Sequence, residues 1–257
     1  MKYLHRFIGF LLIFNLLVGC SPVDLRSPEI KKRSFSAVDK QSVISTLNSF
    51  LSKGSRPQDW KDKTKWKIIL TDTWSSSLLR RFTILTSNTQ KMQLEIDKNG
   101  NLKLEILSGE NIHKVYRIEG NEVFYGDGNI PVKDSTAKLY IESLAMYVKL
   151  PTIISDFPIL LSSDEKSLFS VFATNGTLEP NSEENQYVYV FNKEQKELEH
   201  IQFTYREVYK SYKGILKYSE TKKKGGFKYS NKIQIKETPK DPGSVHEINI
   251  LDFFIGE

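Results

Sequence analysis

The chain has 257 residues and a formal net charge of +6, and Cys20 is its single cysteine. One cysteine excludes an intrachain disulfide, so the protein must be stabilised by an ordinary hydrophobic core, which roughly 200 residues can bury. The positive charge is a mild excess. It suits anionic headgroups or cell-wall polymers, and a solvated surface explains it equally well.

Residues 1–19 have the three parts of a secretory signal. Lys2 and Arg6 precede the apolar run Phe7–Val18, and a small residue, Gly19, stands directly before Cys20. The run is too short to span a bilayer, which takes about 20 apolar residues. A cysteine in this place resembles the lipobox of bacterial lipoproteins, whose cysteine is lipidated after the signal is cut off. We therefore expect Cys20 to be the first residue of the mature protein and its link to the membrane.

Residues 20–35 are expected to be a lipidated N-terminus and tether, because they combine two prolines with the basic run Lys31–Arg33. Ser21 follows the cysteine, whereas aspartate at that place resembles the inner-membrane retention signal of enteric bacteria. By this analogy the protein is expected in the bacterial cell envelope, lipid-anchored at the outer membrane. An exported location argues against a nucleic-acid partner, and the sequence shows no motif for one.

Residues 36–257 are expected to form one domain that begins with a helix. Ser36 or Asp39 is a candidate N-cap, and Gly54 and Pro57 end the helical pattern after about Lys53. One face of this helix is apolar and consists of Val43, Ile44, Leu47, Phe50 and Leu51.

From Trp66 onward the hydrophobic period changes to two, which predicts β-strands. Residues 91–96 and 102–106 alternate apolar and polar on either side of a turn at 97–101, and residues 115–118 and 123–125 predict a second hairpin. The last third of the chain predicts a meander of longer antiparallel strands: Tyr187–Phe191, Leu198–Arg206, Ile215–Glu220, Phe227–Lys236 and Val245–Phe253.

A helical insert separates the two β regions. Asp134 is a suitable N-cap, and an apolar stripe follows at Leu139, Tyr140, Leu144, Tyr147 and Val148. The apolar segment Ile153–Leu161 comes next, and it is interrupted by Pro158. Two interpretations stay open: the segment plugs one face of the sheet, or the insert is a core-facing helix followed by its exit loop.

The sequence shows no recognisable catalytic or metal-binding pattern. His113, His200 and His246 fall in predicted strands without the spacing of metal ligands, and they are expected to be surface or sheet histidines. The serine-nucleophile motifs are absent, and Cys20 would carry lipid. We expect no metal, no cofactor and no enzymatic activity, and a hydrolase with dispersed active-site residues is the weakest of three hypotheses.

The lipobox, the N-terminal helix, the antiparallel meander and the helical insert together resemble the lipoprotein-carrier superfamily of LolA and LolB. Residues 150–253 also resemble a family of uncharacterised Gram-negative lipoproteins. The matching stretches are Leu150–Asp156, Tyr187–Lys193, Leu198–Tyr205, Gly225–Ile235 and Val245–Ile248. The resemblance implies an α+β fold that is mostly antiparallel β, a curved sheet or incomplete β-barrel whose concave face is covered by helices and receives acyl chains.

This resemblance leads to two further hypotheses about function. In the first, a membrane-anchored envelope lipoprotein binds or transfers lipid or lipoprotein acyl chains in an apolar concavity; in the second, it is a non-catalytic structural or protein-interaction module on the outer membrane. The same apolar residues would line the concavity or fill a dry core, and an open cavity above about 300 Å³ distinguishes the two. They are Met92, Leu94, Ile96, Leu102, Leu104, Ile106, Ile201, Phe203, Ile233, Ile235, Ile248 and Ile250.

Overall fold

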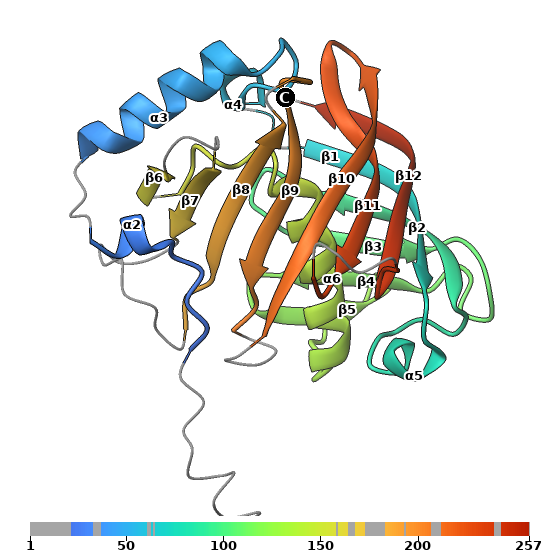
Figure 1. Ribbon diagram of the computed structural model, residues 1–257. Helices are drawn as coiled ribbons and strands as arrows, with labels where there is room; N and C mark the ends of the chain where they lie inside the picture. Colours follow the sequence, from blue (N-terminus) through green and yellow to red (C-terminus); the bar gives the residue numbers. More distant parts are fainter. Residues whose placement is uncertain are drawn as a thin grey trace, which may run out of the picture.

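A computed structural model (Figure 1) describes most of the chain beyond residue 21. The described residues are 22–32, 37–60, 63, 65–157, 159–163, 168–172, 183–192, 194–206, 212–238 and 243–256. The predicted signal segment and Cys20 lie outside these ranges, so the cleavage and lipidation expected there stay predictions.

The domain is built on one antiparallel sheet of 12 strands in the order β5-β4-β3-β2-β1-β12-β11-β10-β9-β8-β7-β6. Because the two edges of this order, β5 and β6, are not paired with each other, the strongly curved sheet stays open as a half-barrel (Figure 1). The strands are β1 (Lys65–Trp74), β2 (Thr89–Ile96), β3 (Leu102–Ile106), β4 (Val115–Glu119), β5 (Glu122–Tyr125), β6 (Ile159–Ser163), β7 (Leu168–Phe172), β8 (Gln186–Asn192), β9 (Glu197–Thr204), β10 (Lys213–Lys224), β11 (Phe227–Lys236) and β12 (His246–Gly256).

The predicted hairpins are confirmed, and their turns follow from local chemistry. Asp97 closes the turn between β2 and β3, because its Oδ1 accepts hydrogen bonds from the backbone N–H groups of Asn99 (2.7 Å) and Asn101 (3.0 Å). Gly225 and Gly226 turn β10 into β11 with φ of +58° and +88°, a conformation that favours glycine. On β2 and β3 every second residue is buried, as the alternating sequence predicts.

The helical insert forms α6 (Ser135–Lys149) inside the curve of the sheet (Figure 1). The predicted N-cap is confirmed, since the Asp134 side chain accepts a hydrogen bond from the backbone of Ala137. At the other end, tyrosines of the sheet satisfy free backbone carbonyls: Tyr218 donates to Tyr147 O (2.9 Å) and Tyr189 donates to Leu150 O (2.8 Å). These bonds hold α6 against the inner face of the half-barrel.

Within the described residues, four further helices lie around the sheet: α2 (Pro28–Lys31), α3 (Ala37–Phe50), α4 (Pro57–Trp60) and α5 (Ser77–Arg80). The predicted N-terminal helix is confirmed as α3, and it packs against β6. Its apolar residues Val43 and Leu47 are buried in the common core.

Three expectations differ from the structure: the conformation of the segment after α6, the position of His113 and the path of the tether. The apolar stretch after α6 is neither a plug nor only an exit loop, because Ile159–Ser163 forms β6, an edge strand paired with β7. A short apolar run has no periodicity that separates these alternatives, so only pairing with β7 settles it. His113 lies in a turn with φ of +68° and not in a strand, because the chain reverses there between β3 and β4.

The described part of the expected tether, residues 22–32, is packed against the domain. The backbone N–H of Leu25 donates to Gln186 Oε1 (2.7 Å), the Arg206 guanidinium donates to Val23 O, and Ile30 is fully buried. The two prolines and the basic run predict a tether here, but the side chains of Gln186 on β8 and of Arg206 after β9 bind the backbone of the segment. The domain boundaries themselves stay predictions.

Candidate functional site

The twelve apolar residues predicted to line the concavity all lie in one buried core. They pack against each other and against α6, so the helix fills much of the concave face. Ile233 and Ile250 border a cavity near the C-terminal end of α6, and Ile235 borders another cavity beside the middle of this helix. The unfilled space that concerns function therefore lies at the two ends of the half-barrel.

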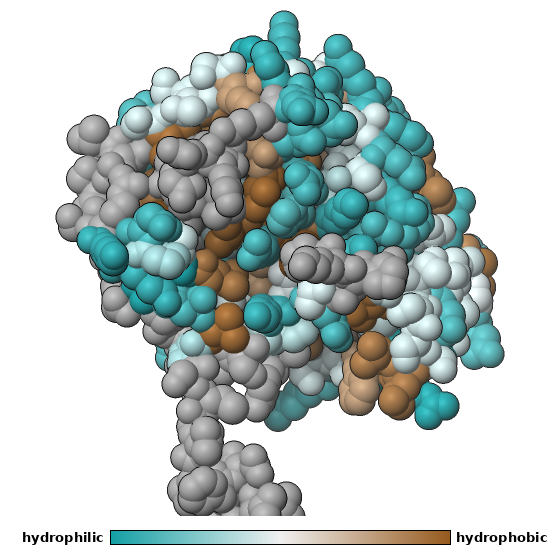
Figure 2. Space-filling model, viewed as in Figure 1, coloured by the Kyte–Doolittle hydropathy of each residue, from teal (hydrophilic) through white to brown (hydrophobic). Residues whose placement is uncertain are grey.

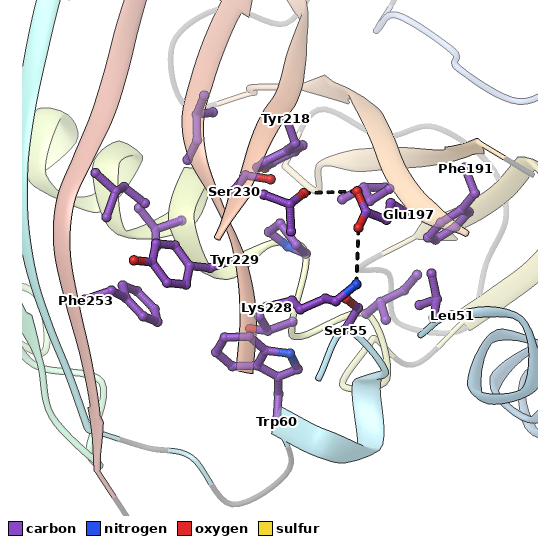
Figure 3. Close-up of a pocket in the computed structure, with 18 of the residues that line it drawn as sticks. Leu51, Ser55, Trp60, Phe191, Glu197, Tyr218, Lys228, Tyr229, Ser230 and Phe253 are labelled. Carbon is purple, nitrogen blue, oxygen red and sulfur yellow. Dashed lines mark hydrogen bonds and ion pairs between the residues drawn. The ribbon is translucent and has the colours of Figure 1, made fainter. Parts of the chain in front are cut away.

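The cavity near the C-terminal end of α6 is small, about 80 Å³, and aromatic rings surround it (Figure 3). Trp60 stacks on Trp66 with ring centroids 5.4 Å apart, and Phe253 meets Trp66 edge-on at 5.3 Å. On its polar side, Lys228 Nζ donates to Ser52 Oγ (2.9 Å) and approaches Glu197 Oε1 (3.4 Å). Because ligand pockets occupy about 300–1,000 Å³, these rings close this end and leave no room for an acyl chain.

The second cavity, here called the α5 cavity, has a volume of about 290 Å³. It lies between the loop around α5, the middle of α6 and the neighbouring ends of β1, β9, β11 and β12. Its apolar wall consists of Trp74, Leu79, Phe82, Leu139, Leu144, Ile235 and Val245. Its remaining lining residues are Thr83, Tyr140, Ser143, Tyr147, Tyr205, Tyr212 and His246.

The mouth of the α5 cavity is hydrophobic. Leu79 and Phe82 line the cavity and are also 39% and 74% exposed, and their neighbour Leu78 is 64% exposed. Figure 2 shows hydrophobic surface at the lower right, over α5. Large apolar side chains exposed together mark a surface for lipid, membrane or partner contact.

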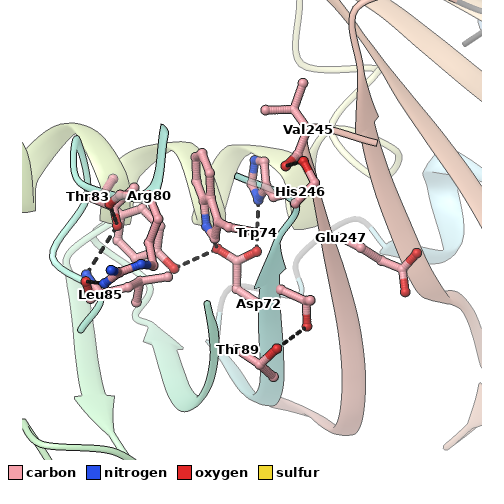
Figure 4. Close-up of polar contacts among 12 residues, drawn as sticks. Asp72, Trp74, Arg80, Thr83, Leu85, Thr89, Val245, His246 and Glu247 are labelled. Atoms are coloured by element: carbon pink, nitrogen blue, oxygen red, sulfur yellow. Dashed lines mark hydrogen bonds and ion pairs between the residues drawn. The ribbon is translucent and has the colours of Figure 1, made fainter. Parts of the chain in front are cut away.

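A polar network lies at the inner wall of the α5 cavity (Figure 4). Asp72 is fully buried, and Tyr140 Oη and Trp74 Nε1 each donate to its Oδ2 over 2.8 Å. His246 Nδ1 lies 2.8 Å from the other oxygen, Oδ1. The His246 ring also stacks on Trp74 with ring centroids 4.2 Å apart, so the stacking and the contact with Asp72 together fix the orientation of the imidazole. The hydrogen bonds and contacts with these three side chains offset the hydration that the carboxylate of Asp72 loses on burial.

The tyrosines of this cavity are neutral hydroxyl groups. Burial raises the pKa of Tyr140 well above the ordinary value of 10.0, and the charge of Asp72 adds to the effect. Burial likewise raises the pKa of Tyr147 and of Tyr212. Ser143 Oγ lies 2.7 Å from Tyr205 Oη and donates to the carbonyl of Leu139. The cavity thus combines an apolar mouth with uncharged hydrogen-bonding groups deeper inside.

Sequence reasoning missed this network, although one signal for it was present. The inward-facing positions of β1 are Trp66, Ile68, Leu70 and Asp72, so the strand places a carboxylate where its pattern calls for an apolar side chain. The register pairs Trp74 of β1 with His246 of β12. That pairing brings together residues 174 positions apart, such as Asp72 and His246, which no local spacing reveals.

The other predicted features give no competing site in the described part of the chain. His200 lies on β9, where burial lowers its pKa below 6.5, and the His113 side chain is 77% exposed. A larger hollow of about 680 Å³ lies over β9 and β10, but mainly polar and charged side chains line it. The described residues contain no group of three or more His, Cys, Asp or Glu side chains that could hold a metal ion. None of the described helices is long and apolar enough to cross a membrane.

Neither a protein-family model nor a curated protein matches this sequence. Among solved structures, the chain is similar to a DUF1329 family protein from Desulfovibrio piger, with a TM-score of 0.51, 12% identity and coverage of 82% of this chain and 92% of that one. This likeness shows a shared fold and nothing finer.

Two further structures align over 86% of this chain and 95% of their own. They are a LolA superfamily protein from Nitrosomonas europaea, with a TM-score of 0.46 and 10% identity, and the Mycobacterium tuberculosis lipoprotein LppX, with a TM-score of 0.30 and 10% identity. The predicted fold, α+β and mostly antiparallel β with a curved sheet that stays open as a half-barrel, is confirmed by the order of the strands and by the helix in the concave face.

Proposed function

We propose that this protein is an envelope lipoprotein that binds an acyl chain, of a lipid or of a lipoprotein, in the α5 cavity. The observation that carries the proposal is an open, mainly apolar cavity of about 290 Å³ inside the half-barrel. Its volume is just below the roughly 300–1,000 Å³ of ligand pockets and just below the size that distinguishes an open concavity from a dry core, which suits one chain or the end of one. Each methylene that enters contributes about 0.8 kcal/mol.

The path of the N-terminal segment supports this proposal. Val23 and Leu25 are bound by Arg206 and Gln186, which lie at the same end of the sheet as Tyr205, a lining residue of the α5 cavity. The blue N-terminal segment and α5 both lie at the lower end of the half-barrel in Figure 1. A lipid on Cys20 would hold this end near the membrane, so that the apolar mouth receives a chain directly from the bilayer.

Binding can be tested on the mature chain, residues 20–257, with Cys20→Ser so that it carries no lipid of its own. After removal of bound lipid, a fluorescent fatty-acyl probe is titrated into the protein. Phe82→Ser should weaken binding about tenfold, since removing an aromatic side chain from the mouth costs about 1.5 kcal/mol of apolar contact. Phe82 is 74% exposed, so its replacement leaves the folded domain intact.

Ile130→Ser is the matched control, because Ile130 is 81% exposed and is not among the residues that line the cavity. Its affinity for the probe should equal that of the parent. Equal weakening in both variants, or no probe binding at all, would contradict the cavity as an acyl site. Absence of co-purified lipid in native mass spectra from several expression hosts would favour the protein-interaction module instead.

The membrane anchor has its own test. Cells that express the full chain are labelled with radioactive palmitate, and we expect label on the protein and a mass consistent with cleavage before Cys20. Cys20→Ser should abolish both the label and the cleavage. Label that persists in Cys20→Ser would show that the lipid is attached elsewhere or that the anchor assignment is wrong.

A further inference from the structure

One polar atom at the inner wall of the α5 cavity has no partner within the described residues. His246 lines the cavity, its side chain is only 6% exposed, and its Nδ1 is engaged with Asp72. No contact of its other ring nitrogen, Nε2, is found in the described part of the chain. This nitrogen is not among the fully buried side-chain atoms that lack a partner in the described residues, so it is accessible from the cavity, where a bound ligand can form a hydrogen bond with it.

The surrounding hydrogen bonds determine what this nitrogen offers. Tyr140 and Trp74 both donate to Oδ2 of Asp72, and His246 contacts its Oδ1. An aspartate side chain is ordinarily ionised at neutral pH, and an ionised carboxylate only accepts hydrogen bonds. The contact with Asp72 therefore requires the proton on His246 Nδ1. A neutral imidazole with its proton on Nδ1 presents Nε2 as an acceptor, and the stacked Trp74 ring keeps the imidazole from turning.

The charges around the site favour one class of ligand. None of the described residues that line the α5 cavity is Lys, Arg, Asp or Glu. A carboxylate or phosphate head would lose its hydration without gaining a fixed cation, and it would face the negative charge of Asp72 behind His246. A neutral hydroxyl group avoids both costs.

Building on the proposed function, we propose that the α5 cavity selects amphiphiles whose polar end is a neutral hydroxyl group, which donates a hydrogen bond to Nε2 of His246. Long-chain alcohols and monoacylglycerols have this chemistry. The hydroxyl end lies at the inner wall, and the acyl or alkyl chain extends toward the exposed side chains of Leu79 and Phe82 at the mouth.

The test compares three ligands with the same alkyl chain on the mature chain carrying Cys20→Ser: dodecanol, dodecyl methyl ether and dodecanoate. Calorimetry or competition with a fluorescent acyl probe gives each affinity. Dodecanol should bind about tenfold more tightly than the ether, which has lost the donor, and more tightly than dodecanoate at neutral pH. This comparison needs no variant, so a folding defect cannot obscure it.

His246→Phe then assigns the preference to the imidazole, because it keeps an aromatic ring on Trp74 and removes both nitrogens. The alcohol and the ether should bind this variant equally. His113→Phe is the control, because it makes the same replacement at a histidine whose side chain is 77% exposed and that is not among the residues lining the cavity, and it should keep the tenfold ratio.

The outcomes separate the two proposals. If none of the three ligands binds, both the proposed acyl-binding function and the hydroxyl preference are wrong. If the alcohol and the ether bind equally well to the parent chain, or if dodecanoate binds best, the acyl site stands and the hydroxyl preference is wrong. The preference is also wrong if it survives unchanged in folded His246→Phe.

Discussion

Asp72 shows at the scale of a single residue how this half-barrel is held together. Its carboxylate joins three elements, because it binds Trp74 of its own strand, Tyr140 of α6 and His246 of β12. A buried carboxylate loses its hydration, and only hydrogen bonds from well-placed donors offset that loss. The same network forms the inner wall of the α5 cavity, so stability and ligand recognition depend on one cluster.

Tyr140→Phe should lower the free energy of unfolding by about 1.5–3 kcal/mol, the usual contribution of a hydrogen bond to a buried charged group. Urea denaturation measures the change. Tyr125→Phe is a close match, because Tyr125 also donates to a carboxylate, that of Asp134 at 2.6 Å, but is 40% exposed. The control should lose less than about 1 kcal/mol, since water replaces the exposed bond. Equal losses would show that burial does not strengthen the Asp72 network.

At the scale of elements, the segment after α3 is locked to the turn between β10 and β11 by Gly54. Its carbonyl accepts from Lys228 N (2.9 Å) and from Trp60 Nε1 (3.1 Å). Its φ is +92°, and a Cβ built on it would lie 2.4 Å from Gly226 O. Glycine is needed here for two reasons, the left-handed backbone and the close approach of two chain segments. This contact closes the end of the half-barrel that the aromatic rings fill.

Gly54→Ala should therefore destabilise the protein by more than the ~1 kcal/mol that a left-handed alanine alone costs at minimum. The matched control is Gly100→Ala, where φ is +81° and a Cβ would meet nothing within 4 Å. Thermal unfolding compares the two, and a loss of 1 kcal/mol corresponds to about 2–4 °C for a domain of this size. The Gly54 variant should lose at least twice as many degrees as the control. Equal shifts would mean that the approach to Gly226 is not tight.

At the scale of the whole molecule, the concave face is rich in tyrosines that are buried as neutral groups. Burial raises the pKa of Tyr140, Tyr147, Tyr189 and Tyr218 well above 10.0. Between the ordinary value and the raised one, the folded state holds protons that the unfolded state has released. The stability that this difference contributes is fully present below pH 10 and is lost as the pH rises through the folded-state pKa values.

We therefore expect the urea midpoint to stay nearly constant up to about pH 9.5 and to fall steeply above about pH 10, where tyrosines in the unfolded chain ionise. The ultraviolet absorbance of tyrosinate should rise together with the loss of structure, because the buried hydroxyls titrate only on unfolding. Tyrosinate that appears at high pH in a fully folded protein would show that these side chains are accessible.

Much of the fold could be read from the sequence because local pattern determines it. The alternation along residues 91–106 and the Asp134 cap predict a hairpin and a helix that the structure confirms. The signal segment and Cys20 are also features of the sequence alone, since they precede the described residues.

Only the tertiary structure determines which parts of the half-barrel interior are filled by side chains and which form cavities. The edge strand β6 forms by pairing with β7, and the contact of Asp72 with His246 joins residues 174 positions apart. The volume that α6 leaves empty depends on how this helix meets several strands at once, among them β1, β8 and β10. A periodic pattern predicts which side of a strand is apolar. A cavity is the space that packed side chains leave unfilled, so its position and volume are determined only when the elements pack together.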